Sequence, residues 1–266
     1  MIKVGIRMKY QSSFLLTEIN KKIIEQGGIP TVLDNFILSE LYSKDQSTLF
    51  KKIINSKNLS SSRYEQVSKR IERIKASELP LLCRLYSQGK NEVYLWKGQP
   101  LFKNLYDKSI YELMIYEIHP LTVIEFGATP TSLRWLKSIA NEYNYNTKVI
   151  GVNIKDFQID ENISFLNIDA NDIQNIKYKK LLDNLEHPLI IIEDCHVNTK
   201  GILEVFSNLM RTGDYMIIED SISKQKEIKD WAVNKMKFFV DTRYTDFFGI
   251  NSVSAVNSII KKMGIR

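Results

Sequence analysis

The chain has 266 residues, 44% of them hydrophobic and 26% charged, enough for one well-filled α/β domain and a smaller appendage. Its two cysteines, Cys83 and Cys195, show neither metal-ligand nor disulfide-framework spacing, which fits a reducing compartment. No apolar run approaches the ~20 residues that a membrane span needs, and charges interrupt the N-terminus too often for a signal peptide. Composition therefore excludes a membrane protein and a disulfide scaffold, and we expect a soluble cytoplasmic protein.

The net charge of +6 is concentrated at the N-terminal end. Residues 1–90 contain 16 Lys and Arg against 8 Asp and Glu, a net of +8, whereas residues 91–266 contain 21 against 23, a net of −2. A nucleic-acid enzyme usually carries its positive field around the active cleft, with aromatic side chains that stack on bases. The near-neutral larger part therefore argues against a nucleic-acid partner, although a basic N-terminal region that holds phosphates stays open as an alternative.

Residues 1–90 are expected to form a mainly helical region after an opening strand at 2–8. The S-x-x-E form of residues 62–65 predicts a capping box for the next helix. Apolar residues of that helix fall on one face: Val67, Ile71 and Ile74. The polar, glycine-containing residues 88–91 predict a boundary before a second domain at 91–266. The N-terminal region can serve as a lid, a substrate wall or an oligomer contact.

From about residue 104, helical patterns alternate with short β-branched runs. The predicted helices cover residues 107–119 and 132–143, and the predicted strands cover 122–127, 148–153, 163–168, 189–192 and 216–218. Such alternation predicts an α/β fold with a doubly wound, mostly parallel sheet.

Acidic residues follow the last two of these strands. Glu193 and Asp194 end one strand, with His196 two residues on, and Glu219 and Asp220 end the next. Because open α/β sheets bind ligands at the carboxyl ends of their strands, these side chains are expected to lie together. Their mutual repulsion favours a bound divalent cation, and the imidazole can accept a proton near neutral pH. The competing interpretation makes Asp194 and Asp220 ordinary helix N-caps.

The turn after the strand at 122–127 bears on cofactor binding. Residues 125–132 contain a single glycine, Gly127, and no G-x-G-x-x-G, which makes a poor cradle for a dinucleotide pyrophosphate. S-adenosylmethionine (SAM) has no phosphate, so one hinge glycine with the acidic Glu125 can suffice. An ordinary strand-to-helix turn is the alternative.

Five separated segments resemble, in the right order, those of the cephalosporin hydroxylase and rhamnosyl O-methyltransferase family. They are W-x-G-x-P at 96–100, E-x-G at 125–127, D-x-H at 194–196, the strand at 213–220 and D-x-F-G-x-N at 246–251. The likeness covers roughly residues 92–262. Members of this family are class I, Rossmann-like SAM-dependent methyltransferases that commonly bind magnesium, so the resemblance implies SAM and Mg²⁺ as cofactors.

The resemblance also implies roles for the acidic strand ends. Asp194, Glu219 and Asp220 would hold the metal and His196 would be the general base, with Glu193 as the rival of Asp194 after a one-residue slip. A magnesium ion that chelates two adjacent acceptor oxygens would orient the acceptor and lower the pKa of its hydroxyl. The expected acceptor is a small molecule with neighbouring oxygens, such as a sugar diol, a catechol or a hydroxy acid.

For the cofactor, the resemblance implies contacts from residues at the first three strand ends: Glu125, Gly127, Thr131, Ser132, Asn153 and Asp169. Two departures from the family pattern stand out. Pro130 and Thr131 replace further glycine, and Asn153 replaces an acidic residue that grips the ribose hydroxyls.

Three functions stay open. The first is a metal-dependent small-molecule O-methyltransferase in biosynthesis, and the second is a degenerate scaffold or partner protein whose altered turn no longer binds SAM. The third is a nucleic-acid methyltransferase that holds phosphates with its basic N-terminal region. Trp96 and Trp231 are expected to be packing residues. Tyr244, Asp246 and Asn251 are expected either to line the acceptor pocket or to form a polar turn. The oligomeric state stays open.

Overall fold

The computed structural model of the chain describes residues 62–173 and 185–264. The expected opening strand at residues 2–8 lies outside these ranges. No helix in the described ranges is long and apolar enough to cross a bilayer.

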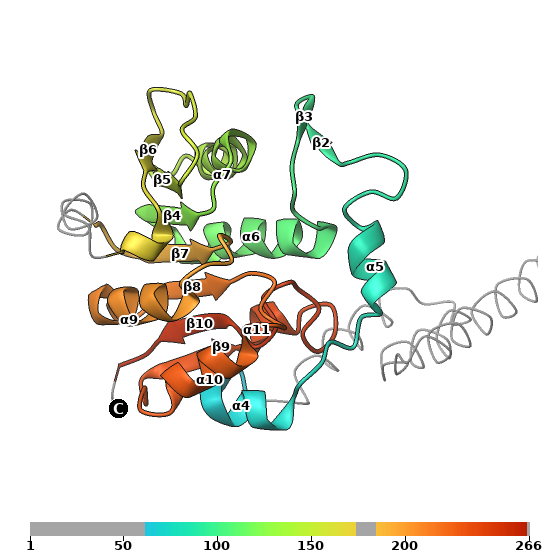
Figure 1. The fold of residues 1–266 in the computed structure, drawn as a ribbon, viewed down its shortest axis with the longest axis vertical. Helices are drawn as coiled ribbons and strands as arrows, with labels where there is room; N and C mark the ends of the chain where they lie inside the picture. The colour runs from blue at the N-terminus through green and yellow to red at the C-terminus, as the bar shows by residue number, and fades with distance from the viewer. Residues whose placement is uncertain (1–61, 174–184, 265–266) are drawn as a thin grey trace, which may run out of the picture.

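A central eight-stranded sheet organises the described residues (Figure 1). From edge to edge its strands are β1 (Tyr64–Gln66), β9 (Phe238–Asp241), β10 (Ile259–Lys262), β8 (Tyr215–Ile218), β7 (Leu189–Glu193), β4 (Thr122–Phe126), β5 (Lys148–Asn153) and β6 (Ser164–Asn167). The five strands from β8 to β6 run parallel, β10 is antiparallel to both β8 and β9, and β1 is antiparallel to β9. This doubly wound, mostly parallel sheet confirms the predicted fold class.

Helices cover both faces of the sheet, as the alternation of side chains along the buried strands requires. Val123 on β4 packs in one hydrophobic cluster with α6 (Leu105–Ile118) and α7 (Pro130–Glu142). Its neighbour Ile124 packs in the other with α4 (Val67–Arg73), α9 (Thr199–Leu209) and α10 (Gln225–Ala232). The shorter elements are α5 (Leu81–Tyr86), the hairpin β2 (Leu95–Trp96) and β3 (Gln99–Pro100), the 3-10 helix η1 (Ala170–Asp172) and α11 (Thr242–Thr245).

The predicted helices of the main domain are confirmed, with small shifts at their starts. Helix α6 begins at Leu105 because the Asn104 side chain accepts a hydrogen bond from the backbone N–H of Asp107. Helix α7 begins at Pro130, two residues before the predicted start, because a proline suits the first turn and Thr129 and Ser132 form a capping box.

The predicted capping box at residues 62–65 is wrong. Tyr64–Gln66 forms β1, paired with β9, and α4 then begins at Val67 with no side-chain cap. Val67 and Ile71 are buried as expected, whereas Ile74 lies beyond the helix end with extended backbone angles. Because β1 extends the main sheet, the expected boundary at residue 90 does not separate the described N-terminal elements from it.

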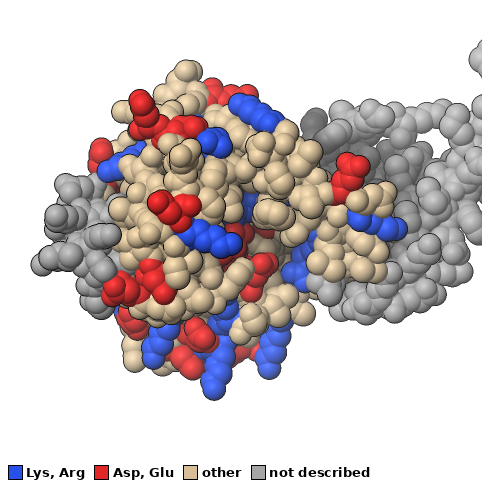
Figure 2. All heavy atoms as spheres, turned by 45° about the horizontal axis from the view of Figure 1, so that its top comes forward, with Lys and Arg blue, Asp and Glu red and all other residues tan. Residues whose placement is uncertain are grey.

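Charged side chains of both signs are interspersed over the surface in Figure 2, and no broad basic patch covers the described part of that face. A buried guanidinium forms ion pairs where α4 meets the chain's C-terminal part.

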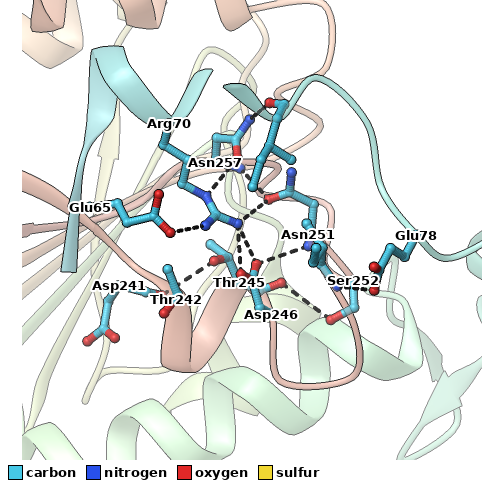
Figure 3. Close-up of polar contacts among 12 residues, drawn as sticks. Glu65, Arg70, Glu78, Asp241, Thr242, Thr245, Asp246, Asn251, Ser252 and Asn257 are labelled. Carbon is cyan, nitrogen blue, oxygen red and sulfur yellow. Dashed lines mark hydrogen bonds and ion pairs between the residues drawn. The ribbon is translucent and has the colours of Figure 1, made fainter. Parts of the chain in front are cut away.

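The Arg70 side chain of α4 joins this N-terminal element to the loop between α11 and β10 (Figure 3). Its guanidinium is fully buried, and it donates to Glu65 Oε1 at 2.9 Å, to Asp246 Oδ1 at 2.6 Å and to Asn257 Oδ1 at 2.9 Å. A buried guanidinium requires such partners because its desolvation is costly. The loop is further closed where the Asn257 backbone N–H donates to Asn251 Oδ1 at 3.0 Å.

Candidate metal and cofactor site at the strand ends

The acidic strand ends meet at one edge of the sheet. The registers place Phe126 of β4 opposite Glu193 of β7, and Glu193 opposite Ile218 of β8, so these strands end side by side. Two groups of three side chains each offer ligand atoms within 4.8 Å of one another. The outer group is Asp194, His196 and Asp220, and the inner group is Glu125, Asp194 and Glu219. Asp194 belongs to both.

The outer group faces solvent. His196 Nε2 lies 3.6 Å from Asp194 Oδ1 and 3.7 Å from Asp220 Oδ2, and the three side chains are 51%, 22% and 66% exposed, respectively. His196 and Asp220 both have left-handed backbones, with φ of 57° and 45°. Non-glycine residues adopt this conformation at a cost, and such residues are concentrated at functional sites. The arrangement offers two carboxylates and one imidazole to a cation or a ligand.

The inner group already holds a cation, the Lys103 ammonium. Lys103 Nζ lies 2.6 Å from Glu219 Oε1, 2.7 Å from Asp194 Oδ2 and 3.1 Å from Glu125 Oε1, and its side chain is 2% exposed. Burial lowers the pKa of Lys103, but the three carboxylates outweigh it and raise that pKa well above its ordinary value. The Tyr111 hydroxyl also donates to Glu219 Oε1. Glu219, predicted as a metal ligand, is therefore bound to Lys103 and Tyr111.

Sequence reasoning missed Lys103, which stands directly before the α6 N-cap in the chain. A lone lysine beside a helix start gives no charge pattern, and only the fold brings it to β4, β7 and β8. Its position three residues after the W-x-G-x-P segment was the one available signal.

The helix-capping interpretation of the acidic residues is wrong for both strands. Asn198 caps α9, because its Oδ1 accepts from the backbone N–H of Gly201 at 3.2 Å. Helix α10 starts after Lys224 and has no side-chain cap. Asp194 and Asp220 thus face the site rather than the helix starts.

The choice between Glu193 and Asp194 also follows from the contacts. Glu193 is fully buried, with Oε2 2.7 Å from Lys224 Nζ and Oε1 accepting the His196 backbone N–H at 3.0 Å. It belongs to neither group of candidate ligands. The geometry therefore favours Asp194 as the ligand and gives Glu193 the task of holding the His196 backbone.

Gly127 is required by a close approach of two backbones. Its φ is +81°, and a Cβ atom there would lie 2.4 Å from the Asp194 carbonyl oxygen. Any other residue would displace the strand end that carries Asp194. The glycine predicted to lie under a cofactor thus also shapes the acidic site.

Two of the predicted cofactor contacts are buried beneath the turn. Glu125 is 1% exposed and accepts a hydrogen bond from the Ser132 hydroxyl, which also closes the α7 capping box. These two side chains fix the turn and the inner acidic group. Thr131 lines a cavity of about 420 Å³ between α7, the β2–β3 hairpin and residues 160–163.

The other two lie at the ends of β5 and β6, at the same edge of the sheet. Asn153 Nδ2 donates to the Ala128 carbonyl at 2.9 Å, and its Oδ1 accepts the Lys155 N–H at 2.9 Å. Asp169 caps η1 through the Asn171 N–H at 2.8 Å. Asn153 therefore links the end of β5 to the turn that follows β4.

Asp107 is a second titratable group that the sequence did not reveal. It is 4% exposed, and its Oδ1 accepts the Ser254 backbone N–H at 2.8 Å. Burial raises the pKa of this carboxyl to about 6, with Asp220 adding to the rise and Ser254 and Lys103 opposing it. The pKa of Asp107 thus depends on the charges of both Asp220 and Lys103.

The remaining candidates are mostly structural. Trp231 is 3% exposed and packs edge-to-face on Phe238, as expected, whereas Trp96 lines the 420 Å³ cavity. Tyr244 donates to Glu117 Oε2 at 2.8 Å. Asp246 and Asn251 accept from Arg70, at 2.6 Å and 3.5 Å, so the polar-turn interpretation describes them.

Comparison with known proteins identifies the chain's relatives. The sequence model of the family "Rhamnosyl O-methyltransferase/CmcI" matches residues 86–238, more than half of the chain. The chain belongs to this family. It is therefore grouped with SAM-dependent methyltransferases, and no curated protein matches it individually.

Solved structures of CmcI share the fold. A CmcI structure described with Mg and SAM is 22% identical, covering 78% of this chain and 94% of that chain, with a TM-score of 0.57. An apo CmcI structure is 21% identical, covering 85% and 100%, also with a TM-score of 0.57. A CmcI structure with SAH is 22% identical, covering 74% and 91%, with a TM-score of 0.56. At these identities the likeness establishes the shared fold.

Proposed function

We propose that the chain is a SAM-dependent, divalent-metal-dependent O-methyltransferase that acts on a small molecule with adjacent oxygens. The observation that carries this proposal is the exposed group of Asp194, His196 and Asp220 at the carboxyl edge of a methyltransferase sheet. Family membership supports the reaction, and the CmcI structure described with Mg and SAM supports the cofactors.

The donor set fits a hard divalent cation. Asp194 and Asp220 each offer a carboxylate oxygen within 4.8 Å of the other, and oxygen ligands suit Mg²⁺. Glu219 is the proposed third ligand, although its Oε1 is 2.6 Å from Lys103 Nζ in this structure. When bound, the ion would orient two neighbouring acceptor oxygens and make the attacking hydroxyl more acidic.

His196 is the proposed general base. Its ring stands at the mouth of the outer group, and its backbone is held by Glu193. A base must come within hydrogen-bond reach of the acceptor hydroxyl, and a half-exposed ring beside the candidate ligands meets that requirement. His196 would accept the hydroxyl proton while the acceptor oxygen bonds to the methyl carbon and the bond from that carbon to the sulfonium sulfur breaks.

SAM is proposed to lie along the ends of β4, β5 and β6. Gly127, Thr131, Asn153 and Asp169 would contact it, while the buried Glu125 and Ser132 shape the turn beneath. Methyl transfer is an in-line displacement, so the protein mainly aligns the acceptor oxygen with the methyl group and excludes water between them.

Residues 91–266 are the proposed methyltransferase domain, with β1 and α4 attached to its sheet. The acceptor is proposed to be a saccharide, polyketide or other biosynthetic intermediate rather than nucleic acid. The interspersed surface charges in Figure 2 support this choice on the face shown. Residues 1–90 are proposed to serve as a lid or an oligomer contact.

A non-catalytic relative is the second candidate, and one observation favours it. The Asn153 side chain is engaged on both sides by backbone groups, where an acidic residue would grip the ribose. Such a protein would keep the fold and fail to bind SAM.

The test is transfer of a labelled methyl group from SAM to a panel of sugars, catechols and hydroxy acids. Each acceptor with vicinal oxygens is paired with its mono-hydroxy analogue, and each reaction is run with Mg²⁺ and with EDTA. We expect label only in vicinal acceptors and only with Mg²⁺. Label that is independent of the metal would contradict the proposed metal role, and no label with any acceptor, together with no SAM binding, would favour the scaffold.

A further inference from the structure

Lys103 occupies the position of a cation inside the acidic site. Its ammonium is within 3.1 Å of oxygens from three different carboxylates, those of Glu125, Asp194 and Glu219. The side chains of Lys103, Glu125 and Glu219 are 2%, 1% and 5% exposed, so water screens the charges of these three groups little, whereas Asp194 is 22% exposed. One ammonium therefore pairs with three carboxyl groups, two of which are buried.

The cluster and the outer group share one carboxylate. Asp194 Oδ2 accepts from Lys103 Nζ at 2.7 Å, while Asp194 Oδ1 lies 3.6 Å from His196 Nε2 in the outer group. A divalent ion that binds Asp194 must therefore share this carboxylate with the Lys103 ammonium, which binds its other oxygen. The ion and the Lys103 ammonium repel each other, and the buried surroundings screen this repulsion poorly.

The backbone and the packing hold the Lys103 ammonium in this place. Leu101, two residues before it, is 1% exposed, and Asn104, directly after it, caps α6. The ammonium also lies 5.8 Å from the centre of the buried Tyr111 ring, whose hydroxyl donates to Glu219. The buried Leu101 and the helix cap Asn104 therefore hold the backbone on either side of Lys103.

We infer that Lys103 is an internal competitor of the divalent cation: its ammonium compensates Asp194 and Glu219 in the ion-free protein and keeps the affinity for the ion low. This inference rests on the proposed function, because it assigns the same edge of the sheet to a metal. Lys103 is a positioning residue, since it acts through the carboxylates it holds. Its removal leaves Glu125, Asp194 and Glu219 as a deeper, all-oxygen site, which divalent ions prefer.

The chain offers a matched control in Lys224. This lysine is also buried, and its Nζ lies 2.7 Å from Glu193 Oε2 and 2.9 Å from the Glu219 carbonyl oxygen. It compensates one carboxylate that belongs to neither group of candidate ligands. Lys224→Met therefore removes a buried ammonium close to the site but leaves the carboxylates of both candidate ligand groups with their partners.

The experiment is a titration of the full chain with Mn²⁺, followed by electron paramagnetic resonance of the free ion, without SAM or acceptor. We expect K103M to bind Mn²⁺ at least about tenfold more tightly than the wild type, since a like charge a few ångströms away is removed. K224M should gain much less affinity for Mn²⁺ than K103M, because Lys224 pairs with no carboxylate of the candidate ligand groups. The gain should vanish in the double variant K103M/E219Q, because the released Glu219 would supply a ligand. Unchanged or weaker binding by K103M would overturn the inference.

Folding of K103M is read separately by circular dichroism with EDTA and with Mn²⁺. A protein that folds only with the ion, or whose melting temperature the ion raises more than that of the wild type, supports the inference, because the ion replaces the ammonium. A K103M protein that is unfolded in both conditions overturns it. If the wild type binds no SAM but K103M still gains Mn²⁺, the proposed function fails while the assignment of Lys103 stands.

Discussion

His196 and Asp220 meet across the ends of two neighbouring strands, with His196 Nε2 3.7 Å from Asp220 Oδ2. Both residues have left-handed backbones, which the chain sustains only because the surrounding sheet holds them. Glu193 fixes the His196 backbone from below. The fold therefore places a carboxylate and an imidazole, which can accept a proton, side by side at the strand ends.

Asp220→Asn tests the carboxylate at this opening. We expect Mn²⁺ affinity to fall at least about tenfold, in the range seen when groups at metal sites are changed. SAM affinity should change much less, and turnover should fall with the metal. Calorimetric titration with each ligand checks this. The exposed Asp230 of α10 gives the control D230N, which should behave like the wild type. Equal losses of SAM and Mn²⁺ binding in D220N would indicate a structural role.

Gly127→Ala tests the backbone approach beneath the site. The new Cβ would lie 2.4 Å from the Asp194 carbonyl oxygen at a φ of +81°, so we expect a loss of about 2–4 kcal/mol in unfolding free energy. Mn²⁺ affinity should fall as well, because Asp194 must move. Gly213 has a φ of +101° with nothing within 4 Å of its Cβ position, so G213A should cost only about 1 kcal/mol. Urea unfolding that gives equal losses would refute the contact.

Arg70→Met tests the link between α4 and the C-terminal loop. Removing the buried guanidinium leaves Glu65 and Asp246 without their shared partner, and we expect a loss of about 3–5 kcal/mol. Arg73 is the matched control, because it also pairs with Glu65 but is 58% exposed, so R73M should cost less than about 1 kcal/mol. Chemical denaturation measures both. Similar costs would mean that the Arg70 network contributes little.

Asp107 predicts a pH dependence of stability. Its pKa is raised from 3.8 to about 6 in the folded protein, so the folded state binds this proton more tightly than the unfolded state. The resulting stabilisation is full below pH 3.8 and is lost as the pH rises through 6, and it amounts to about 3 kcal/mol at most. Compared with the wild type, Asp107→Asn should lack this loss between pH 4 and 7. Urea unfolding at several pH values checks it, with D230N as the unchanged control, and parallel wild-type and D107N profiles would contradict the assignment.

Local patterns predicted the strands that deliver the site, because buried parallel strands are continuous apolar runs with recognisable ends. They also brought Asp194, His196 and Asp220 to one edge. Lys103 and Arg70 escaped prediction because Lys103 pairs with Glu219 and Arg70 pairs with Asp246, partners that lie far away in the sequence. The antiparallel strands β1, β9 and β10 were missed because they lie outside the regular alternation of strand and helix from which the other strands were predicted.

The most direct test of the central claim is calorimetric titration of the wild-type chain with SAM, in Mg²⁺ and in EDTA, followed by the same titrations after adding an acceptor with vicinal oxygens. We expect saturable one-to-one SAM binding in both conditions and acceptor binding only with Mg²⁺. No heat of SAM binding in either condition, from a protein that melts cooperatively, would contradict it.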